Sequence, residues 1–162
     1  MKKLIFVLSL LILILTGCDN RKYNILSYQD KSIAAKCTVN EKYSLTVEKA
    51  DGVYRVKIDK PANLCGVEFE IGEGYATVKT DTVKIDIEKS KIQGICAISQ
   101  IFSLEEGALT GATEKGDDAV LTFENTLGSY TLTLGKNSMP KHITISSSSY
   151  SYEITVDEIS IK

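Results

Sequence analysis

The sequence predicts a mainly β protein, in which a curved antiparallel sheet of about ten strands forms a half-barrel covered by one helix. Three observations predict this fold class. Apolar and polar residues alternate along most of the chain after residue 37, as in strands with one buried face. Short turns rich in Gly, Asp and Asn separate these runs. The apolar period lengthens to three or four residues in one segment, 91–106.

Length and composition exclude several function classes. The chain has 162 residues, a formal net charge of −2, one His and no Trp. The length suits one domain, and the balanced charge gives no electrostatic basis for binding nucleic acid. One His leaves little material for acid–base catalysis or for a metal site with several His ligands. We therefore expect no enzyme activity, no cofactor, no metal and no nucleic-acid partner.

Residues 1–17 have the pattern of a signal peptide. Lys2 and Lys3 precede an apolar run, Leu4 to Leu15, which as a helix spans about 18 Å and is too short for a bilayer core of about 30 Å. The run ends in Leu15-Thr16-Gly17-Cys18, which resembles the bacterial lipobox. The resemblance implies cleavage between Gly17 and Cys18 and acylation of Cys18. The protein is then expected to be lipid-anchored to the cell membrane, with its domain outside the cytoplasm, on the extracellular face or in the periplasm.

The mature chain divides into two parts. Residues 18–36 are polar with scattered apolar positions, and we interpret them as the lipidated N-terminus and a tether. This tether is either a flexible spacer or one short helix near Tyr28–Lys36. Residues 37–162 are predicted to form a single antiparallel β domain.

The predicted strands fall into two groups. The first group contains the runs 43–48, 54–59, 67–71, 76–79 and 83–88, with turns at Asp51-Gly52 and Gly72-Glu73-Gly74. The second group contains the runs 108–113, 119–124, 129–134, 142–147 and 150–157. Its turns are expected at Gly116-Asp117, Leu127-Gly128, Lys136-Asn137 and Ser146–Ser149.

Between the two groups, Lys91–Glu106 is predicted to be an amphipathic helix that ends near Gly107. A buried strand is the alternative, because many of its apolar residues are β-branched. As a helix, the segment should point Ile95, Ile98 and Phe102 inward, and Gln93 and Gln100 outward. One helix cannot cover so many strands, so the sheet must curl on itself. A β-sandwich or a small closed barrel is the alternative to the half-barrel.

A family resemblance rests on several segments in order. These are Tyr54–Asp59, Pro61-Ala62-Asn63-Leu64, Gly66–Ile71, the apolar segment 92–104, and Pro140 before the strand that holds Ile143 and Ile145. Together they resemble the LolA/LolB-like lipoprotein-carrier superfamily over residues 43–158. The resemblance implies an incomplete antiparallel barrel that is lidded by helices and encloses an apolar cavity. The chain departs from the family in lacking a long N-terminal helix and any Trp.

A set of apolar residues falls on one face of successive strands or on the helix. We predict that they line the cavity: Val56, Ile58, Phe69, Ile71, Val78, Ile85, Ile87, Ile98 and Phe102. Such a lining suits a lipid or an acyl chain; alternatively, these residues form only the core. The function predicted is a membrane-anchored envelope lipoprotein that binds an apolar ligand. The alternative is a structural or accessory envelope lipoprotein that binds another protein through its sheet face or edge.

Three cysteines remain once Cys18 is acylated: Cys37, Cys65 and Cys96. Outside the cytoplasm, disulfides persist. Cys65 lies in a loop that enters a strand, and Cys96 lies on the apolar side of the predicted helix. If the helix packs into the sheet, these two residues meet, so one expectation is a Cys65–Cys96 disulfide. The alternative is three buried free thiols that act as small apolar side chains.

Overall fold

A computed structural model describes residues 31–104 and 108–161. These residues form one eleven-stranded sheet and one α-helix, which confirms the predicted fold class. The strands are β1 (Ile33–Val39), β2 (Tyr43–Ala50), β3 (Val53–Lys60), β4 (Glu68–Ile71), β5 (Ala76–Lys79), β6 (Lys84–Asp86), β7 (Leu109–Lys115), β8 (Asp118–Asn125), β9 (Gly128–Leu134), β10 (Pro140–Ser146) and β11 (Ser151–Ile161).

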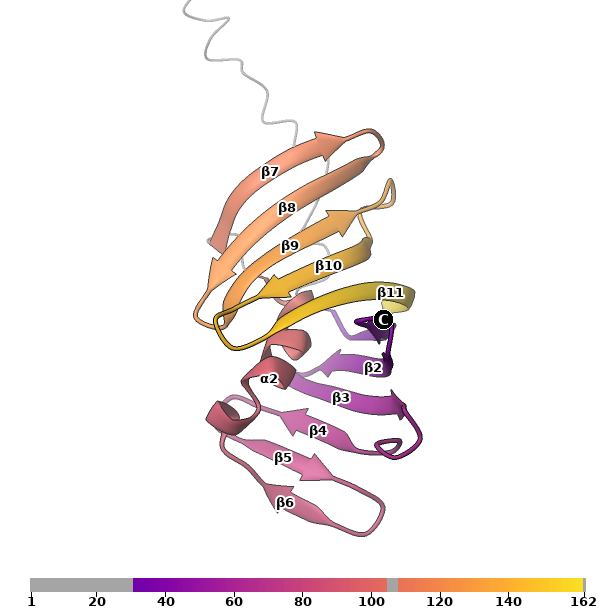
Figure 1. Cartoon of the computed structure of the whole chain (residues 1–162), viewed down its shortest axis with the longest axis vertical. Helices are drawn as coiled ribbons and strands as arrows, with labels where there is room; N and C mark the ends of the chain where they lie inside the picture. Colours follow the sequence, from indigo (N-terminus) through magenta and orange to yellow (C-terminus); the bar gives the residue numbers. More distant parts are fainter. Residues whose placement is uncertain (1–30, 105–107, 162) are drawn as a thin grey trace, which may run out of the picture.

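The sheet is built from two antiparallel meanders joined at its centre. Its strand order is β6-β5-β4-β3-β2-β1-β11-β10-β9-β8-β7. The edge strands β6 and β7 therefore lie at opposite ends of a twisted, open sheet, and the covering helix connects them along the chain (Figure 1). This open sheet, rather than a sandwich or a closed barrel, is the half-barrel predicted.

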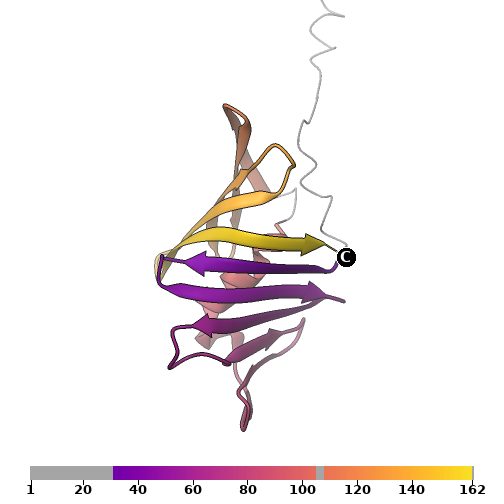
Figure 2. The ribbon, with the colours of Figure 1, turned by 90° about the vertical axis from the view of Figure 1, so that its right-hand side faces the viewer.

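The central strand β1 is the one that the sequence pattern did not reveal. It pairs with β2 on one side and with β11 on the other, so the first and last described strands lie side by side (Figure 2). It begins at Ile33, before Cys37, where the sequence placed the start of the domain. Its buried positions alternate, but two of them are the small residues Ala35 and Cys37. Alanine is a strong helix former, so this alternation resembles a tether or a short helix more than a central strand.

The helix prediction is confirmed in kind, but the α-helix is shorter than predicted. A 3₁₀ turn, η2 (Lys89–Lys91), leads into α2 (Gln93–Ser99), which continues as a second 3₁₀ turn, η3 (Gln100–Phe102). No side chain caps the N-terminus of α2, and β-branched Ile residues lower its helix propensity. Ile98 and Phe102 are buried and Gln93 is exposed, as predicted, whereas Ile95 and Gln100 are half-buried. The expected stop, Gly107, and residues 105 and 106 lie outside the described residues.

One face of the sheet carries the helix and the core. We call it the covered face. α2 packs against β2, β3 and β4, and the main cluster joins residues of the helix segment to strands from both meanders. Its largest fully buried side chains include Tyr130, Phe102, Phe123 and Ile101. The two meanders thus share one core.

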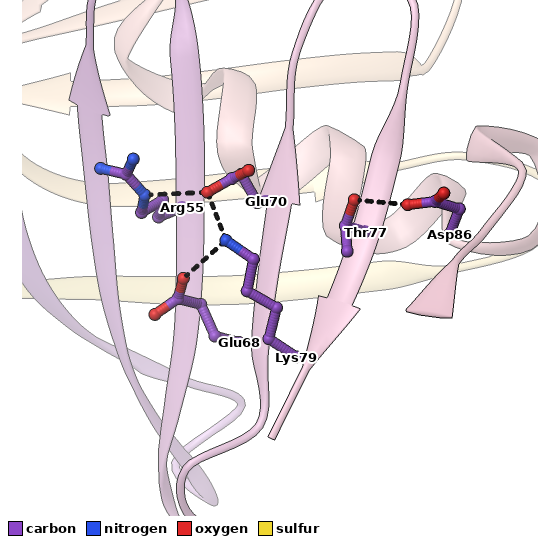
Figure 3. A network of polar contacts seen from close by, with 6 residues as sticks. All are labelled: Arg55, Glu68, Glu70, Thr77, Lys79 and Asp86. Carbon is purple, nitrogen blue, oxygen red and sulfur yellow. Dashed lines mark hydrogen bonds and ion pairs between the residues drawn. The ribbon is translucent and has the colours of Figure 1, made fainter. Parts of the chain in front are cut away.

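The opposite, outer face is polar. On β3, β4 and β5 the register places Arg55 opposite Glu70 and Glu68 opposite Lys79. Glu70 accepts from Arg55 Nε at 3.3 Å and from Lys79 Nζ at 2.6 Å (Figure 3). The Lys79 hydrogen bond is the largest cause that lowers the pKa of Glu70 below its ordinary value. This ladder of opposite charges keeps the outer face in water and supports cross-strand pairing.

Candidate functional site

The residues predicted to line a cavity separate into two groups in the structure. Those under the helix are packed in the core, and Val56 and Phe102 are both 0% exposed. Towards β6 the packing ends: Phe69, Val78 and Ile87 are half-buried, and Ile85 is 58% exposed. The remaining members, Ile58, Ile71 and Ile98, are buried. The centre of the half-barrel is therefore filled by the protein's own side chains.

These residues form a continuous apolar row across the sheet. Val56 pairs with Phe69, Phe69 with Val78, and Val78 with Ile85. Exposure rises along this row from the core to the edge. The helix covers one end of the row, and the other end is open to solvent.

A groove lies beside α2, and only Ile71 of the predicted lining contributes to it. Its volume is about 590 Å³. We call it the α2 groove. Three turns, at Gly52, Gly72-Glu73 and Thr126-Leu127, surround it together with the helix segment. The other lining residues are Tyr54, Ile71, Lys89, Ser90, Gln93, Cys96, Ser99 and Gln100. The turns were recognisable in the sequence, but their meeting depends on the twist of the whole sheet.

The α2 groove is lined by both apolar and polar side chains. Tyr54, Ile71, Cys96 and Leu127 supply apolar surface, and Ile71 and Cys96 belong to a small buried cluster with Ala76 and Ile92. Hydroxyl, amide and charged side chains of the helix segment supply polar groups. Ligand sites commonly have this composition and a volume of roughly 300–1,000 Å³.

Polar contacts fix the covering segment, residues 89–104, to the turns around the groove. Lys89 Nζ donates to the backbone oxygens of Gly72 and Glu73, the latter at 2.7 Å. At the other end, Tyr54 Oη donates to Ser103 Oγ at 2.5 Å. These contacts tie the segment to β3 and to the β4–β5 turn, so the groove has defined walls.

Two tyrosines of the second meander lie near the helix and the groove, with Tyr152 next to Gly94 of α2. Tyr150 and Tyr152 stack with ring centroids 5.5 Å apart. Tyr150 Oη donates to the backbone oxygen of Leu127 at 2.5 Å, which holds the β8–β9 turn at the groove. Both rings are half-buried, so they serve packing in this structure.

Tyr130 lies deeper in the core and is fully buried. Its hydroxyl forms no well-formed hydrogen bond among the described residues. Burial is the main cause that raises the pKa of Tyr130 to about 12, although the nearby Asn125 side chain acts to lower it. The sequence does not predict whether this hydroxyl is hydrogen-bonded, because the alternation of apolar and polar residues in β9 shows only that Tyr130 faces the core.

The three described cysteines are free thiols. Cys65 is exposed in the β3–β4 loop, whereas Cys96 is buried in α2 beside the groove, and Cys37 is buried in β1. Burial raises the pKa of Cys37 to about 12 and also raises the pKa of Cys96. The structure therefore does not join Cys65 to Cys96.

Two further observations concern membranes and metals. No helix among residues 31–104 and 108–161 combines the length and hydropathy needed to cross a bilayer. In the same residues, His, Cys, Asp and Glu side chains do not gather in groups of three or more that could hold a metal ion. The predicted cleavage and lipidation residues, Gly17 and Cys18, lie outside the described part of the chain.

Comparison with known proteins finds similarity in fold. No protein-family model matches the chain, and no curated protein matches it significantly. An uncharacterized conserved protein from Thermus thermophilus has a TM-score of 0.52 at 15% identity, with 85% of each chain covered. A putative outer membrane lipoprotein-sorting protein domain from Vibrio parahaemolyticus has a TM-score of 0.48 at 11% identity, with 88% of each chain covered. A LolA superfamily protein from Nitrosomonas europaea has a TM-score of 0.41 at 13% identity, covering 83% of this chain and 87% of that one.

Proposed function

We propose that the protein is a membrane-anchored envelope lipoprotein whose role is binding rather than catalysis. The lipobox-like residues Leu15-Thr16-Gly17-Cys18 support the anchor. Acyl chains contribute about 0.8 kcal/mol per buried methylene, and stable anchoring needs two membrane-binding signals, such as a second acyl chain. The domain would then lie outside the cytoplasm, on the extracellular face or in the periplasm.

Metabolic labelling with palmitate tests the anchor. The full-length protein should incorporate the label and sediment with membranes, and Cys18→Ala should do neither. Cys65→Ala is the matched control, because it removes an exposed thiol of the folded domain and should label as well as the parent. Label that persists in Cys18→Ala contradicts the proposal.

We further propose that the α2 groove binds the acyl chain of a lipid or fatty acid. The observation that carries this is the apolar part of the groove lining, bordered by the fixed covering segment and by exposed polar residues. An acyl chain would contact Tyr54, Ile71 and Leu127. Its polar end would lie near Gln93 and Ser90 at the rim. The site proposed is beside α2 because Phe102 and its neighbours are packed in the core.

Two measurements test this ligand. Native mass spectrometry of protein purified from its own envelope should show a bound lipid. A fluorescent fatty acid should bind at micromolar concentration and be displaced by palmitate. Leu127→Gln should weaken binding by about tenfold, since it puts an amide into the apolar wall of the groove.

Leu64→Gln is the matched control for that variant. Leu64 is also a half-buried leucine packed against the main core, but it lies in the β3–β4 loop and does not line the groove. Equal loss of binding in both variants, or no binding by the parent protein, contradicts a site in the groove.

The second candidate is an accessory lipoprotein that binds another protein through its sheet face or edge. The filled centre of the half-barrel favours it, since Phe102, Ile101 and Ile98 occupy the space that a carrier would leave open. A protein without co-purified lipid and without fatty-acid binding, but with its folded domain intact, would support this candidate.

A further inference from the structure

The edge strand β6 leaves apolar side chains in solvent. All three of its residues, Lys84–Asp86, are exposed. Ile85 is 58% exposed, and Val83 just before the strand is 48% exposed. An exposed edge with apolar side chains is a template for pairing with another strand.

The other edge, β7, is built differently. Its pairing with β8 is irregular between Leu109 and Gly111, and its exposed residues are small, polar or charged. An irregularity of this kind protects an edge from further pairing. β6 pairs with β5 in a regular register, so it is the edge that is ready to accept a strand.

Pairing with β5 decides which backbone groups of β6 are already hydrogen-bonded and which are free. Thr80 N–H donates to Val83 O, and Ile87 N–H donates to Ala76 O, so the odd-numbered residues bond inward to β5. In an antiparallel ladder the intervening residues direct their backbone groups to the other side. Lys84 and Asp86 therefore offer their N–H and C=O groups to the free edge.

The free backbone groups of Lys84 and Asp86 limit how two copies of β6 can pair. With Lys84 opposite Lys84, or with Asp86 opposite Asp86, like charges face each other, which is unfavourable. A two-fold axis at Ile85 instead puts Lys84 opposite the partner subunit's Asp86, twice. In this register the outward backbone groups of both residues meet those of the partner, and Ile85 faces the partner subunit's Ile85.

We propose that the protein pairs with a second copy of itself through β6, about a two-fold axis at Ile85. Val83 then lies opposite the partner subunit's Ile87 on the covered face, so the exposed apolar side chains become mutually buried. The charges on the outer face complement one another. Asp86 is held in place by Thr77, whose Oγ1 donates to its Oδ1 at 3.0 Å (Figure 3). Neither Lys84 nor Asp86 forms an ion pair within the described residues.

Pairing through one short strand makes a small interface. Stable protein interfaces bury about 1,200–2,000 Å², so the dimer should be weak and dependent on concentration. The interface is isologous and closes on itself. It therefore predicts dimers and no larger assemblies.

Cysteine cross-linking tests the two-fold axis. In the full-length protein carrying Cys65→Ser, Ile85→Cys places two thiols at a non-hydrogen-bonded pair with Cα atoms about 4.5 Å apart, within the range of a disulfide. Mild oxidation should give a dimer on a non-reducing gel. Val83 is 48% exposed, but in this register Val83→Cys faces the partner subunit's Ile87, and Thr113→Cys lies on the exposed strand β7. Both controls should cross-link at least about tenfold more slowly. Equal rates, or no dimer from Ile85→Cys, overturn the proposal.

Charge exchange gives an independent test by analytical ultracentrifugation. Lys84→Glu and Asp86→Lys should each weaken the dimer by about fivefold or more, because like charges then face each other. The double variant Lys84→Glu/Asp86→Lys should restore it, while circular dichroism confirms that each variant is folded. Failure of the double variant to dimerise better than the single variants overturns the register.

Discussion

Gly94 of α2 lies directly against the hydroxyl of Tyr152 on β11. A Cβ atom on Gly94 would be 2.2 Å from Tyr152 Oη and 3.1 Å from its Cζ. The absence of a side chain on Gly94 therefore sets how closely the helix approaches the sheet. The Tyr152 hydroxyl is partly desolvated there, which raises its pKa.

We predict that Gly94→Ala destabilises the protein by about 1–3 kcal/mol, as overpacking does. In an unhindered helix the same change would stabilise by about 1 kcal/mol. Tyr152→Phe removes the obstructing oxygen, so the double variant should recover most of the loss. Thermal denaturation measures all three variants.

Gly74→Ala is the control for the substitution itself. No atom lies within 4 Å of a Cβ at Gly74, so this variant should be close to the parent in stability. A Gly94→Ala protein that is as stable as the parent would show that α2 does not rest on Tyr152.

The second prediction compares two tyrosines. Tyr130→Phe removes a buried hydroxyl that forms no well-formed hydrogen bond among the described residues, with only Asn125 nearby to interact with it, and it should leave the free energy of unfolding unchanged or raise it by about 1 kcal/mol. Tyr150→Phe removes the hydrogen bond to Leu127 O and should cost about 1 kcal/mol. Urea denaturation of both variants tests this. A larger loss for Tyr130→Phe would reveal a partner for its hydroxyl.

The third prediction concerns alkaline pH. The pKa of Cys37 is about 12 in the folded state, against about 8.5 for an ordinary thiol. Because the pKa of this thiol is higher in the folded than in the unfolded protein, the neutral thiol stabilises the fold fully at pH values below the unfolded pKa. This stabilisation is lost as the pH rises from there towards 12. The free energy of unfolding should therefore fall through this thiol by up to about 1.4 kcal/mol per pH unit above pH 8.5. Denaturation at several pH values measures that slope.

Cys37→Ala should make this slope shallower, and part of the slope that remains should come from Cys96, whose pKa burial also raises. At neutral pH an alkylating reagent should modify Cys65 in the folded protein, and Cys37 and Cys96 only after unfolding. Rapid native labelling of Cys37 would contradict the burial of β1.

The sequence predicted most of the strands because one face of each is buried and the other is wet, and this imposes a period of two. It missed β1, since Ala35 and Cys37 are too small to mark a strand although they lie at the centre of the sheet. It also did not reveal the α2 groove. The turns at Gly52, Gly72 and Leu127 are far apart along the chain, and only the twist of the sheet brings them to one site.

The predicted cavity lining shows a related limit. Alternation assigns Val56 and Ile85 to the same face, which the register confirms. It cannot tell that the helix covers one and leaves the other in solvent. Coverage depends on where a short α2 crosses the sheet. The α-helix is shorter than predicted because β-branched Ile residues lower its propensity and no side chain caps its N-terminus.

The last prediction separates a fixed core residue from a movable lid. Phe102 is 0% exposed and belongs to the core cluster that contains residues of both meanders. If Phe102 is a fixed core residue, Phe102→Ala should lower the free energy of unfolding by about 3–5 kcal/mol. At a temperature where the variant is folded, its affinity for a fatty acid should change little. Ile85→Ala, measured at a concentration at which the protein is monomeric, is the control, because a side chain that is 58% exposed should cost less than about 0.5 kcal/mol. If Phe102→Ala is instead tolerated and fatty-acid binding changes strongly, then Phe102 moves to admit ligand, and the ligand site extends beneath α2 into the half-barrel.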